Sequence, residues 1–432
     1  MLNSSVLITC SFRSNSVLQH LSMTKHGQDD TDKATRVSMK VLLATDCYLF
    51  QTGGVTSVVV SLENGLRKNG CDVKVLALAN GNRSYREGDS YFIRSLRFPD
   101  YPEHRFSLAM HDPLLNELME WNPDIIHIHT EATAGWMAQI IAKKTDTPVV
   151  MTTHTDFEFF MFGRFRGIWI IRKLAAVWGK RAYKMAETVI VPAEKARDFP
   201  HLQPVRDKVT VVPNGIELDR YQKPVSPEEK EALFSQYGLR DNGYTLVMIT
   251  RLSKEKNAIE ILQFFPNLLR VLPEAQLVIV GEGPDRKRLE TFTAQNGLSE
   301  HVRFTGRISP DIIYRYYAMG DLFVSASTFE LHSMSYLEAM ACGLPLVCRE
   351  DSSLRGVLEN GKNGFIYRNE QEFIDAVSEI LKSATLRERM SEEALRRAET
   401  AGNQYFVERM LALYRSVCSS WASHASEQQK ES

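Results

Sequence analysis

The feature that most constrains the fold is a pattern of short apolar runs, each followed by a turn and a helix-length segment, that passes along the chain twice. The first series begins at Lys40 and ends at Val212, and the second begins at Thr245 and ends at Val347. Continuous apolar runs that alternate with helices are typical of parallel strands buried on both faces. The pattern therefore predicts an α/β fold with two doubly wound sheets.

The length of the chain supports two domains, because 432 residues are too many for one ordinary core. The breakers Pro213-Asn-Gly215 separate the two series. We predict Rossmann-like domains over 39–215 and 216–395. We also predict a C-terminal helix and polar tail over 396–432, packing back across both domains, with helical pattern from about 386 to 416. Residues 1–38 are rich in Ser, Thr and Asn, and we interpret them as a disordered extension or a mis-start.

Charge and composition exclude several classes of protein. The 52 basic and 53 acidic residues nearly cancel, which argues against a nucleic-acid partner. The sequence contains no apolar run of about 18 residues, so we expect no membrane-spanning helix. The six cysteines include no Cys-x-x-Cys pair, which favours reduced thiols. His127 and His129 share a strand face, but no further ligand completes a set, so we expect a packed strand end and no metal site.

The most specific segment is Ser327–Pro345, which follows an apolar run and opens a helix. Glu330 falls in its loop and Glu338 in its helix, and carboxylates suit sugar hydroxyls because these donate hydrogen bonds. Free backbone N–H groups at the helix start favour a phosphate, and they belong to Ser333, Met334 and Ser335. The alternative is an ordinary amphipathic helix with solvated glutamates. The strand, loop, helix and Gly-Leu-Pro exit together favour a ligand site.

Other candidate ligand groups also follow apolar runs. Arg251 and Lys256 come after the run at 245–249 and could neutralise a diphosphate, although they could also be solvated charges. The glycine pair ending at Gly54 would allow a ligand to approach the backbone, but such a pair is often only a turn. His154 ends the run at 148–153 and could hydrogen-bond a sugar.

These segments together resemble the signature of glycosyltransferase family four. The members of that family are retaining enzymes with two facing Rossmann-like domains, an arrangement called the GT-B fold. The match runs from about Lys40 to Tyr414. One departure is Ser333, where the family usually has glycine, and His332 is also unusual at its position. The further matching segments are Gln51–Val55, Thr153–Thr155, Val212–Ile216, Thr250–Asn257, Val280–Pro284 and Phe304–Arg307.

The resemblance implies a site in the cleft between the domains, with a UDP-sugar held by the C-terminal domain. It places Glu338 at the ribose, Glu330 at a sugar hydroxyl, and the acceptor beside Gly54 and His154. The implied catalytic residues are Glu330, His154, Arg251 and Lys256. The implied donor-binding residues are Gly54, Arg251, Lys256, Arg307, Glu330, Ser333, Met334, Ser335 and Glu338. UDP-glucose would be a substrate and no cofactor would be tightly bound. Mg²⁺ stimulation is not indicated, because no Asp-x-Asp motif suits a metal-held diphosphate.

A basic stretch between Glu158 and Glu187 suggests where the acceptor is met. It contains seven basic residues, interleaved with aromatic ones, and no acidic residue. Such a stretch suits an anionic bilayer surface, although a core-packed helix with a solvated basic face would look similar. The predicted membrane or acceptor residues are Trp169, Arg172, Lys173, Lys180 and Arg181.

A finer resemblance is to bacterial 1,2-diacylglycerol 3-α-glucosyltransferases, in Asp124–Lys143, Val324–Thr328, Cys348–Asp351 and Gly361–Phe365. It implies transfer of glucose from UDP-glucose to diacylglycerol by a cytoplasmic enzyme peripheral on the inner face of the membrane, with anionic lipids as partners. One alternative is the same chemistry with another sugar nucleotide, or with a soluble or different lipid acceptor. Another is a non-transferring sugar-nucleotide epimerase or binding protein.

Overall fold

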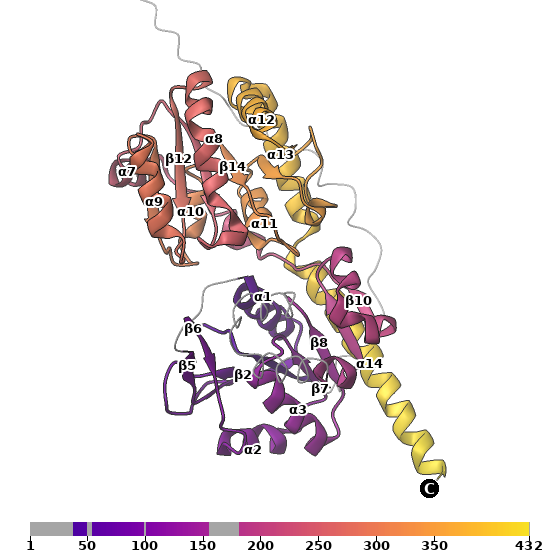
Figure 1. Cartoon of the computed structure of the whole chain (residues 1–432). Coiled ribbons are helices and arrows are strands. Elements are labelled where there is room, and N and C mark those ends of the chain that lie inside the picture. Colours follow the sequence, from indigo (N-terminus) through magenta and orange to yellow (C-terminus); the bar gives the residue numbers. More distant parts are fainter. Residues whose placement is uncertain (1–37, 50–53, 99–100, 155–180, 432) are drawn as a thin grey trace, which may run out of the picture. The chain divides into compact units, whose positions relative to one another are not determined.

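The structure is a computed structural model that describes residues 38–49, 54–98, 101–154 and 181–431, with the backbone alone at 98, 101–104 and 425–431. Residues Met39–Ser432 form one compact unit. It contains two mainly parallel sheets, each with helices packed on its faces (Figure 1). The predicted α/β fold with two doubly wound sheets is confirmed.

The first sheet has eight strands in the order β10-β9-β8-β7-β1-β2-β4-β3, and only the β3–β4 pair is antiparallel among its described pairings. Its strands are β1 (Lys40–Thr45), β2 (Asp72–Leu78), β3 (Tyr85–Glu87), β4 (Ser90–Ile93), β7 (Ile125–Ile128), β8 (Val149–Thr152), β9 (Thr188–Val191) and β10 (Val209–Val211). A separate antiparallel pair joins β5 (Leu96–Phe98) to β6 (Tyr101–Phe106). The sequence pattern did not predict β3 to β6. β3 is the edge strand of the first sheet, β4 lies between β3 and β2, and β5 and β6 lie outside that sheet.

The second sheet has six strands in the order β13-β12-β11-β14-β15-β16, and its described pairings are parallel. Every residue of β12 is buried, which explains its unbroken apolar character. Its strands are β11 (Tyr244–Ile249), β12 (Ala275–Val280), β13 (Val302–Gly306), β14 (Leu322–Ser325), β15 (Leu346–Arg349) and β16 (Gly364–Tyr367).

Each sheet is buried between two layers of helices. On the first sheet, one core cluster contains residues of α1 and α14, and the other contains residues of α2 and α3. On the second, α8, α9 and α12 contribute to one cluster, and α7, α10 and α11 to the other. The helices are α1 (Gly54–Lys68), α2 (Pro113–Trp121), α3 (Thr133–Thr145), α6 (Leu218–Tyr221), α7 (Pro227–Tyr237), α8 (Ala258–Val271), α9 (Arg286–Gln295), α10 (Ile313–Tyr317), α11 (Met334–Ala341), α12 (Glu370–Lys382), α13 (Ala384–Thr400) and α14 (Asn403–Glu431). The 3₁₀ segments among the described residues are η1 (Glu194–Asp198), η2 (Pro200–Lys208), η3 (Lys254–Lys256) and η4 (Ser352–Leu354).

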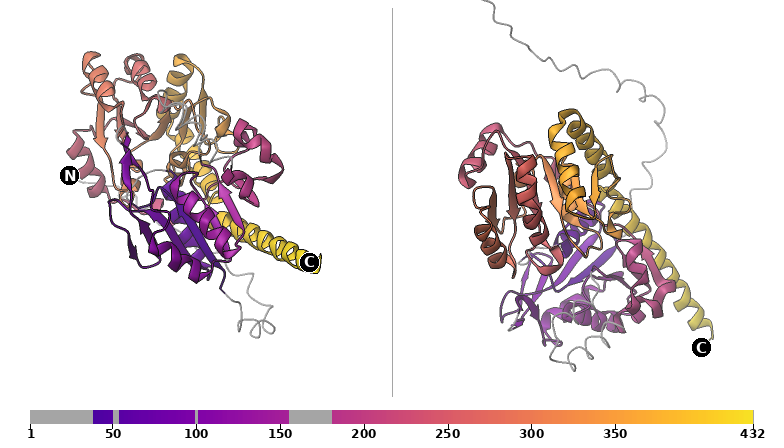
Figure 2. Two further views of the ribbon diagram at one scale, coloured as in Figure 1. Left: turned by 60° about the horizontal axis from the view of Figure 1, so that its bottom comes forward. Right: turned by 45° about the horizontal axis from the view of Figure 1, so that its top comes forward.

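The predicted C-terminal helical stretch consists of two helices. It is divided at Ala401-Gly402 into α13 and α14. α14 then packs on the first sheet: a methyl group added at Gly65 of α1 would lie 2.2 Å from a methyl carbon of Val407. The Tyr414 hydroxyl lies 2.6 Å from Nδ1 of His127 in β7. Both views in Figure 2 show α14 extending past this sheet to the C-terminus. The last helix therefore completes the core of the first sheet.

None of the helices in the described part of the chain has both the length and the apolar character that a bilayer-spanning segment needs.

Candidate functional site

The carboxyl edge of the second sheet is a tightly packed set of loops. The Leu252 backbone N–H donates to the carbonyl of Glu282 at 2.9 Å, and that of Gly281 donates to the carbonyl of Gly306 at 2.9 Å. A methyl group at Gly283 would lie 2.1 Å from the carbonyl oxygen of Leu252, so this close approach requires glycine. The loops after β11, β12 and β13 are thereby fixed to one another.

Lys256 and Glu330, 74 residues apart in sequence, meet at this edge. The Lys256 ammonium lies 2.5 Å from Oε1 of Glu330, and their side chains are 22% and 11% exposed. The loop that carries Glu330 is also anchored by its backbone, because Thr328 N–H donates to the carbonyl of Glu255 at 2.9 Å. Since β11 and β14 are neighbours in the sheet, their following loops bring the two charges together.

The start of α11 faces the start of α1. A methyl group added at Gly54, the first residue of α1, would lie 3.7 Å from Cγ of Met334, the first residue of α11. Ser333 precedes α11 but its side chain does not cap the helix, and its hydroxyl lies 3.0 Å from that of Ser335. Helix N-termini carry partial positive charge. Two of them facing each other make a surface suited to an anion.

Glu338 lies within α11 and is held by two tyrosines. Its carboxylate oxygens accept hydrogen bonds from the hydroxyls of Tyr221, at 2.8 Å, and Tyr317, at 2.7 Å. Burial raises the pKa of Glu338, and the two tyrosine hydrogen bonds oppose that effect. Each oxygen keeps a further lone pair, so the carboxylate is oriented but still able to accept a ligand hydroxyl. Sequence reasoning missed both tyrosines, which come from α6 and α10.

His154 lies just beyond β8 and contacts a second histidine. Its Nε2 is 3.1 Å from Nδ1 of His129, and the two rings are stacked with centroids 5.4 Å apart. Burial lowers the pKa of His154 to about 4, so the imidazole is neutral near pH 7. His127 is fully buried, and its Nε2 lies 2.7 Å from the Thr152 hydroxyl. The packed strand end that we expected for the His-x-His pair agrees with these contacts.

Two predicted donor-site cations lie at the same carboxyl edge but outside the Lys256–Glu330 contact. Arg251 follows β11 and lies near Glu255. Burial tends to raise the pKa of Glu255. The Ser253 hydroxyl and the positive charges of Lys256 and Arg251 outweigh burial, so the pKa of Glu255 is lowered. Arg307 follows β13 and is exposed.

Most of the predicted membrane stretch falls outside the described residues. That holds for Trp169, Arg172, Lys173 and Lys180, whereas Arg181 is described and is exposed.

A second ion pair, which the sequence did not suggest, joins the two sheets' loops. The Lys195 ammonium lies 2.9 Å from both carboxylate oxygens of Asp351. Lys195 follows β9 of the first sheet and Asp351 follows β15 of the second. The same ammonium lies 5.4 Å from the ring centroid of Phe329, the neighbour of Glu330.

Comparison with known proteins identifies this arrangement. A model of "Glycosyltransferase Family 4" matches residues 52–220, and one of "Glycosyl transferases group 1" matches residues 229–397. The chain belongs to the family-four glycosyltransferases. It is a hexosyltransferase, so an epimerase or a protein that only binds sugar nucleotides is no longer a competing interpretation.

Similar curated proteins include two glycolipid synthases. The chain is 29% identical to "Alpha-monoglucosyldiacylglycerol synthase" of Streptococcus pneumoniae, over 79% of this chain and 78% of that protein. It is 26% identical to the synthase of the same name from Acholeplasma laidlawii, over 82% of this chain and 92% of that protein.

The fold of this glycosyltransferase also matches solved structures. Anabaena Alr3699/HepE in complex with UDP-glucose aligns with a TM-score of 0.68 at 19% identity, covering 88% of this chain and all of the other. The catalytic domain of starch synthase IV from Arabidopsis thaliana aligns with a TM-score of 0.68 at 17% identity, again covering 88% of this chain and all of the other. The predicted GT-B fold is confirmed.

Proposed function

We propose that this glycosyltransferase transfers glucose from UDP-glucose to diacylglycerol at a membrane surface, with retention of configuration, and forms α-monoglucosyldiacylglycerol. The observations that carry the donor assignment are the mostly buried Lys256–Glu330 pair and the N-termini of α1 and α11, which face each other. The names of the two synthases support the lipid acceptor, and the UDP-glucose complex of a protein with the same fold supports the donor.

In this proposal the donor lies along the carboxyl edge of the second sheet. The N-terminus of α11 and the cations Arg251 and Lys256 hold the diphosphate. Glu338, already oriented by its two tyrosines, accepts from the ribose hydroxyls. Arg307 lies on the nucleotide side. Glu330 accepts from a hydroxyl of the glucose, and its pairing with Lys256 couples recognition of the sugar to recognition of the phosphate.

The reaction proceeds on the face of the sugar that carries the leaving group. The acceptor hydroxyl oxygen forms a bond to the anomeric carbon as the bond from that carbon to the UDP oxygen breaks. The acceptor proton passes to a phosphate oxygen of the departing UDP. Negative charge grows on the diphosphate during this step, so Lys256, Arg251 and the helix N-terminus stabilise the transition state more than the ground state. Neutral His154 is suited to hydrogen-bond the sugar.

The acceptor is assigned to the N-terminal half. We propose that residues 39–215 form the acceptor domain and 216–395 the donor domain, with 396–432 as the returning helix and its tail. The basic stretch that includes Lys173 and Lys180 would hold the enzyme on anionic lipid at the inner face of the membrane, since each basic residue near such a surface contributes about 1 kcal/mol.

The reaction is tested with purified full-length protein, UDP-glucose and liposomes that contain diacylglycerol and phosphatidylglycerol. We expect mass spectrometry of the lipid extract to show one hexose added to diacylglycerol, and α-glucosidase but not β-glucosidase to remove it. Liposomes without diacylglycerol are the control. Release of UDP without a lipid product would refute the acceptor, and absence of both would refute the donor.

Membrane attachment is tested by charge reversal in the basic stretch. Lys173→Glu/Lys180→Glu should reduce sedimentation with phosphatidylglycerol vesicles, and added salt should reduce that of the wild type. Lys143→Glu/Lys144→Glu is the matched control, because these exposed lysines of α3 undergo the same change of charge. Equal sedimentation of both variants and the wild type would remove this stretch from the membrane contact.

A further inference from the structure

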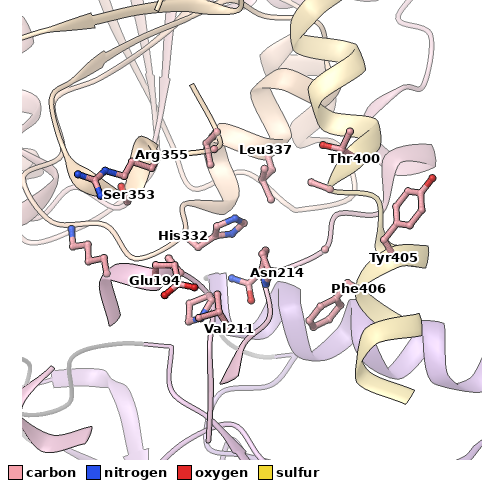
Figure 3. A pocket seen from close by; sticks show the side chains of 18 of the residues that line it. Glu194, Val211, Asn214, His332, Leu337, Ser353, Arg355, Thr400, Tyr405 and Phe406 are labelled. Atoms are coloured by element: carbon pink, nitrogen blue, oxygen red, sulfur yellow. The ribbon is translucent and has the colours of Figure 1, made fainter. Parts of the chain in front are cut away.

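A cavity lies beside α11, and the proposed donor residues do not line it. Its volume is about 1100 Å³, and its walls come from Leu337 and Met340 of α11, His332, the segment after β9, the turn around η4 and the start of α14 (Figure 3). Among the described residues, those that line it do not include Lys256, Glu330 or Glu338. A volume of this order accommodates a small organic ligand.

The walls of this cavity are strongly basic. Glu194 and Asp198 are the acidic residues among those that line it, and its cationic residues are Lys195, Arg197, Arg206, Arg355, Arg397 and Arg409. The cavity is therefore lined by three times as many basic as acidic residues. This is a local concentration of positive charge, because the whole chain has a net charge of −1.

Two of the cations have no carboxylate partner. Lys195 pairs with Asp351, Arg197 with Glu194, Arg206 with Asp198 and Arg397 with Glu359. Arg355 and Arg409, in contrast, form no ion pair with any part of the chain that the structure describes. Two guanidinium groups are therefore available to an anionic ligand, and guanidinium matches the geometry of phosphate oxygens.

Another buried polar atom in the same walls lacks a partner. Nδ1 of His332 is buried and has no hydrogen-bond partner among the described residues. Ser353 is buried beside Asp351, whose carboxylate accepts a hydrogen bond from the Ser353 backbone N–H at 2.8 Å. Figure 3 shows His332 and Ser353 at the cavity wall. A buried polar atom without a partner is unfavourable, and a bound ligand would satisfy it.

We propose that this cavity binds a small ligand through a phosphate group, which the guanidinium groups of Arg355 and Arg409 attract. The volume left beyond a phosphate accommodates a polyol or sugar body. The phosphate could belong to a soluble phosphorylated polyol or to the headgroup of an anionic lipid, and the experiment distinguishes the two. The inference goes beyond the proposed function, because none of the donor or acceptor residues contributes to this site.

The test uses the full chain with the donor site saturated by UDP. Calorimetric titration with inorganic phosphate and with sn-glycerol 3-phosphate tests the soluble source. Binding to phosphatidylcholine vesicles with and without phosphatidic acid tests the lipid source. We expect Arg355→Gln/Arg409→Gln to weaken binding of the effective probe at least tenfold. The control Arg389→Gln/Arg415→Gln removes two exposed arginines from α13 and α14 that do not line the cavity, and should bind within twofold of wild type.

A second measurement separates binding from folding. Arg355 and Arg409 are exposed, so thermal melts of Arg355→Gln/Arg409→Gln should give the Tm of the wild type while binding weakens. The proposal is overturned if no phosphate probe binds the wild type saturably, or if Arg355→Gln/Arg409→Gln binds as tightly as wild type. The titrations are repeated without UDP, so that the comparison of variants stands even if UDP does not bind.

Discussion

Lys256 and Glu330 allow the donor site to be tested as a coupled unit. The changes are Lys256→Met, Glu330→Gln and the two together. Each side chain is mostly buried, at 22% and 11% exposure, so each charge acts in a partly desolvated site. Removing one preorganised contact to a transition-state charge typically costs about 3 kcal/mol. Since 1.36 kcal/mol is a factor of ten in rate, each single change should lower kcat/KM for UDP-glucose about 100-fold.

The double variant carries the decisive information. Independent effects would multiply to a loss of about 10⁴-fold. The ammonium and carboxylate lie 2.5 Å apart, and groups in contact commonly couple by about 2 kcal/mol, or about 30-fold. We therefore expect the double variant to lose only about 300-fold. Initial rates of UDP release with diacylglycerol liposomes measure all the variants.

Lys254→Met is the matched control, because Lys254 is exposed and lies in the same short turn as Lys256. It should keep its rate within twofold, and thermal melts of every variant should show a folded protein. Losses that multiply to about 10⁴-fold would refute the coupling. Wild-type rates for either single variant would refute the assignment of this edge as the donor site.

Three further outcomes follow from the buried site and its loops. Burial lowers the pKa of His127 to about 3, against about 6.5 when unfolded, so as pH falls from 6.5 toward 3 the unfolded state gains the proton first. The free energy of unfolding should then fall by up to about 1.4 kcal/mol per pH unit, and urea titrations of His127→Asn should show a smaller slope. Gly283→Ala should lower Tm by several degrees because of its clash with a carbonyl, whereas Gly81→Ala, which has open space, should stay within about one degree. Tyr317→Phe removes one hydrogen bond to Glu338, the carboxylate that we propose binds the ribose, and should weaken UDP binding about fivefold in calorimetry, while Tyr316→Phe should not.

The strands of the two sheets were largely predictable from the sequence because burial on both faces leaves continuous apolar runs. The apolar runs at 245–249 and 148–153 became β11 and β8, with ends that differ by one residue at most. The short β3 and β4 were missed, because strands of three and four residues leave little periodic signal. The break between α13 and α14 was also missed. Gly402 forms a bridge to Ile216, and that tertiary contact is not visible in the local helical pattern.

The site was predictable only where strand order determines proximity. The loops after neighbouring strands share one edge, which is why the expected Lys256 and Glu330 meet. The tyrosines that orient Glu338 come from two helices remote in sequence, and no local pattern indicates that they converge. Lys195 and Asp351 are 156 residues apart, and each looks like an ordinary surface charge in the sequence.

The return of α14 to the first sheet affects how the chain can fold during synthesis. Phe406, Met410 and Tyr414 belong to the same buried cluster as Val41 and Leu43 of β1. A ribosome completes the strands of the first sheet long before it reaches these residues, since α14 begins at Asn403. One face of the nascent first domain therefore stays uncovered, and open to chaperones or aggregation, until almost the whole polypeptide has emerged. A premature stop before α14 would consequently damage the N-terminal domain, although every residue of that domain's sheet would have been made.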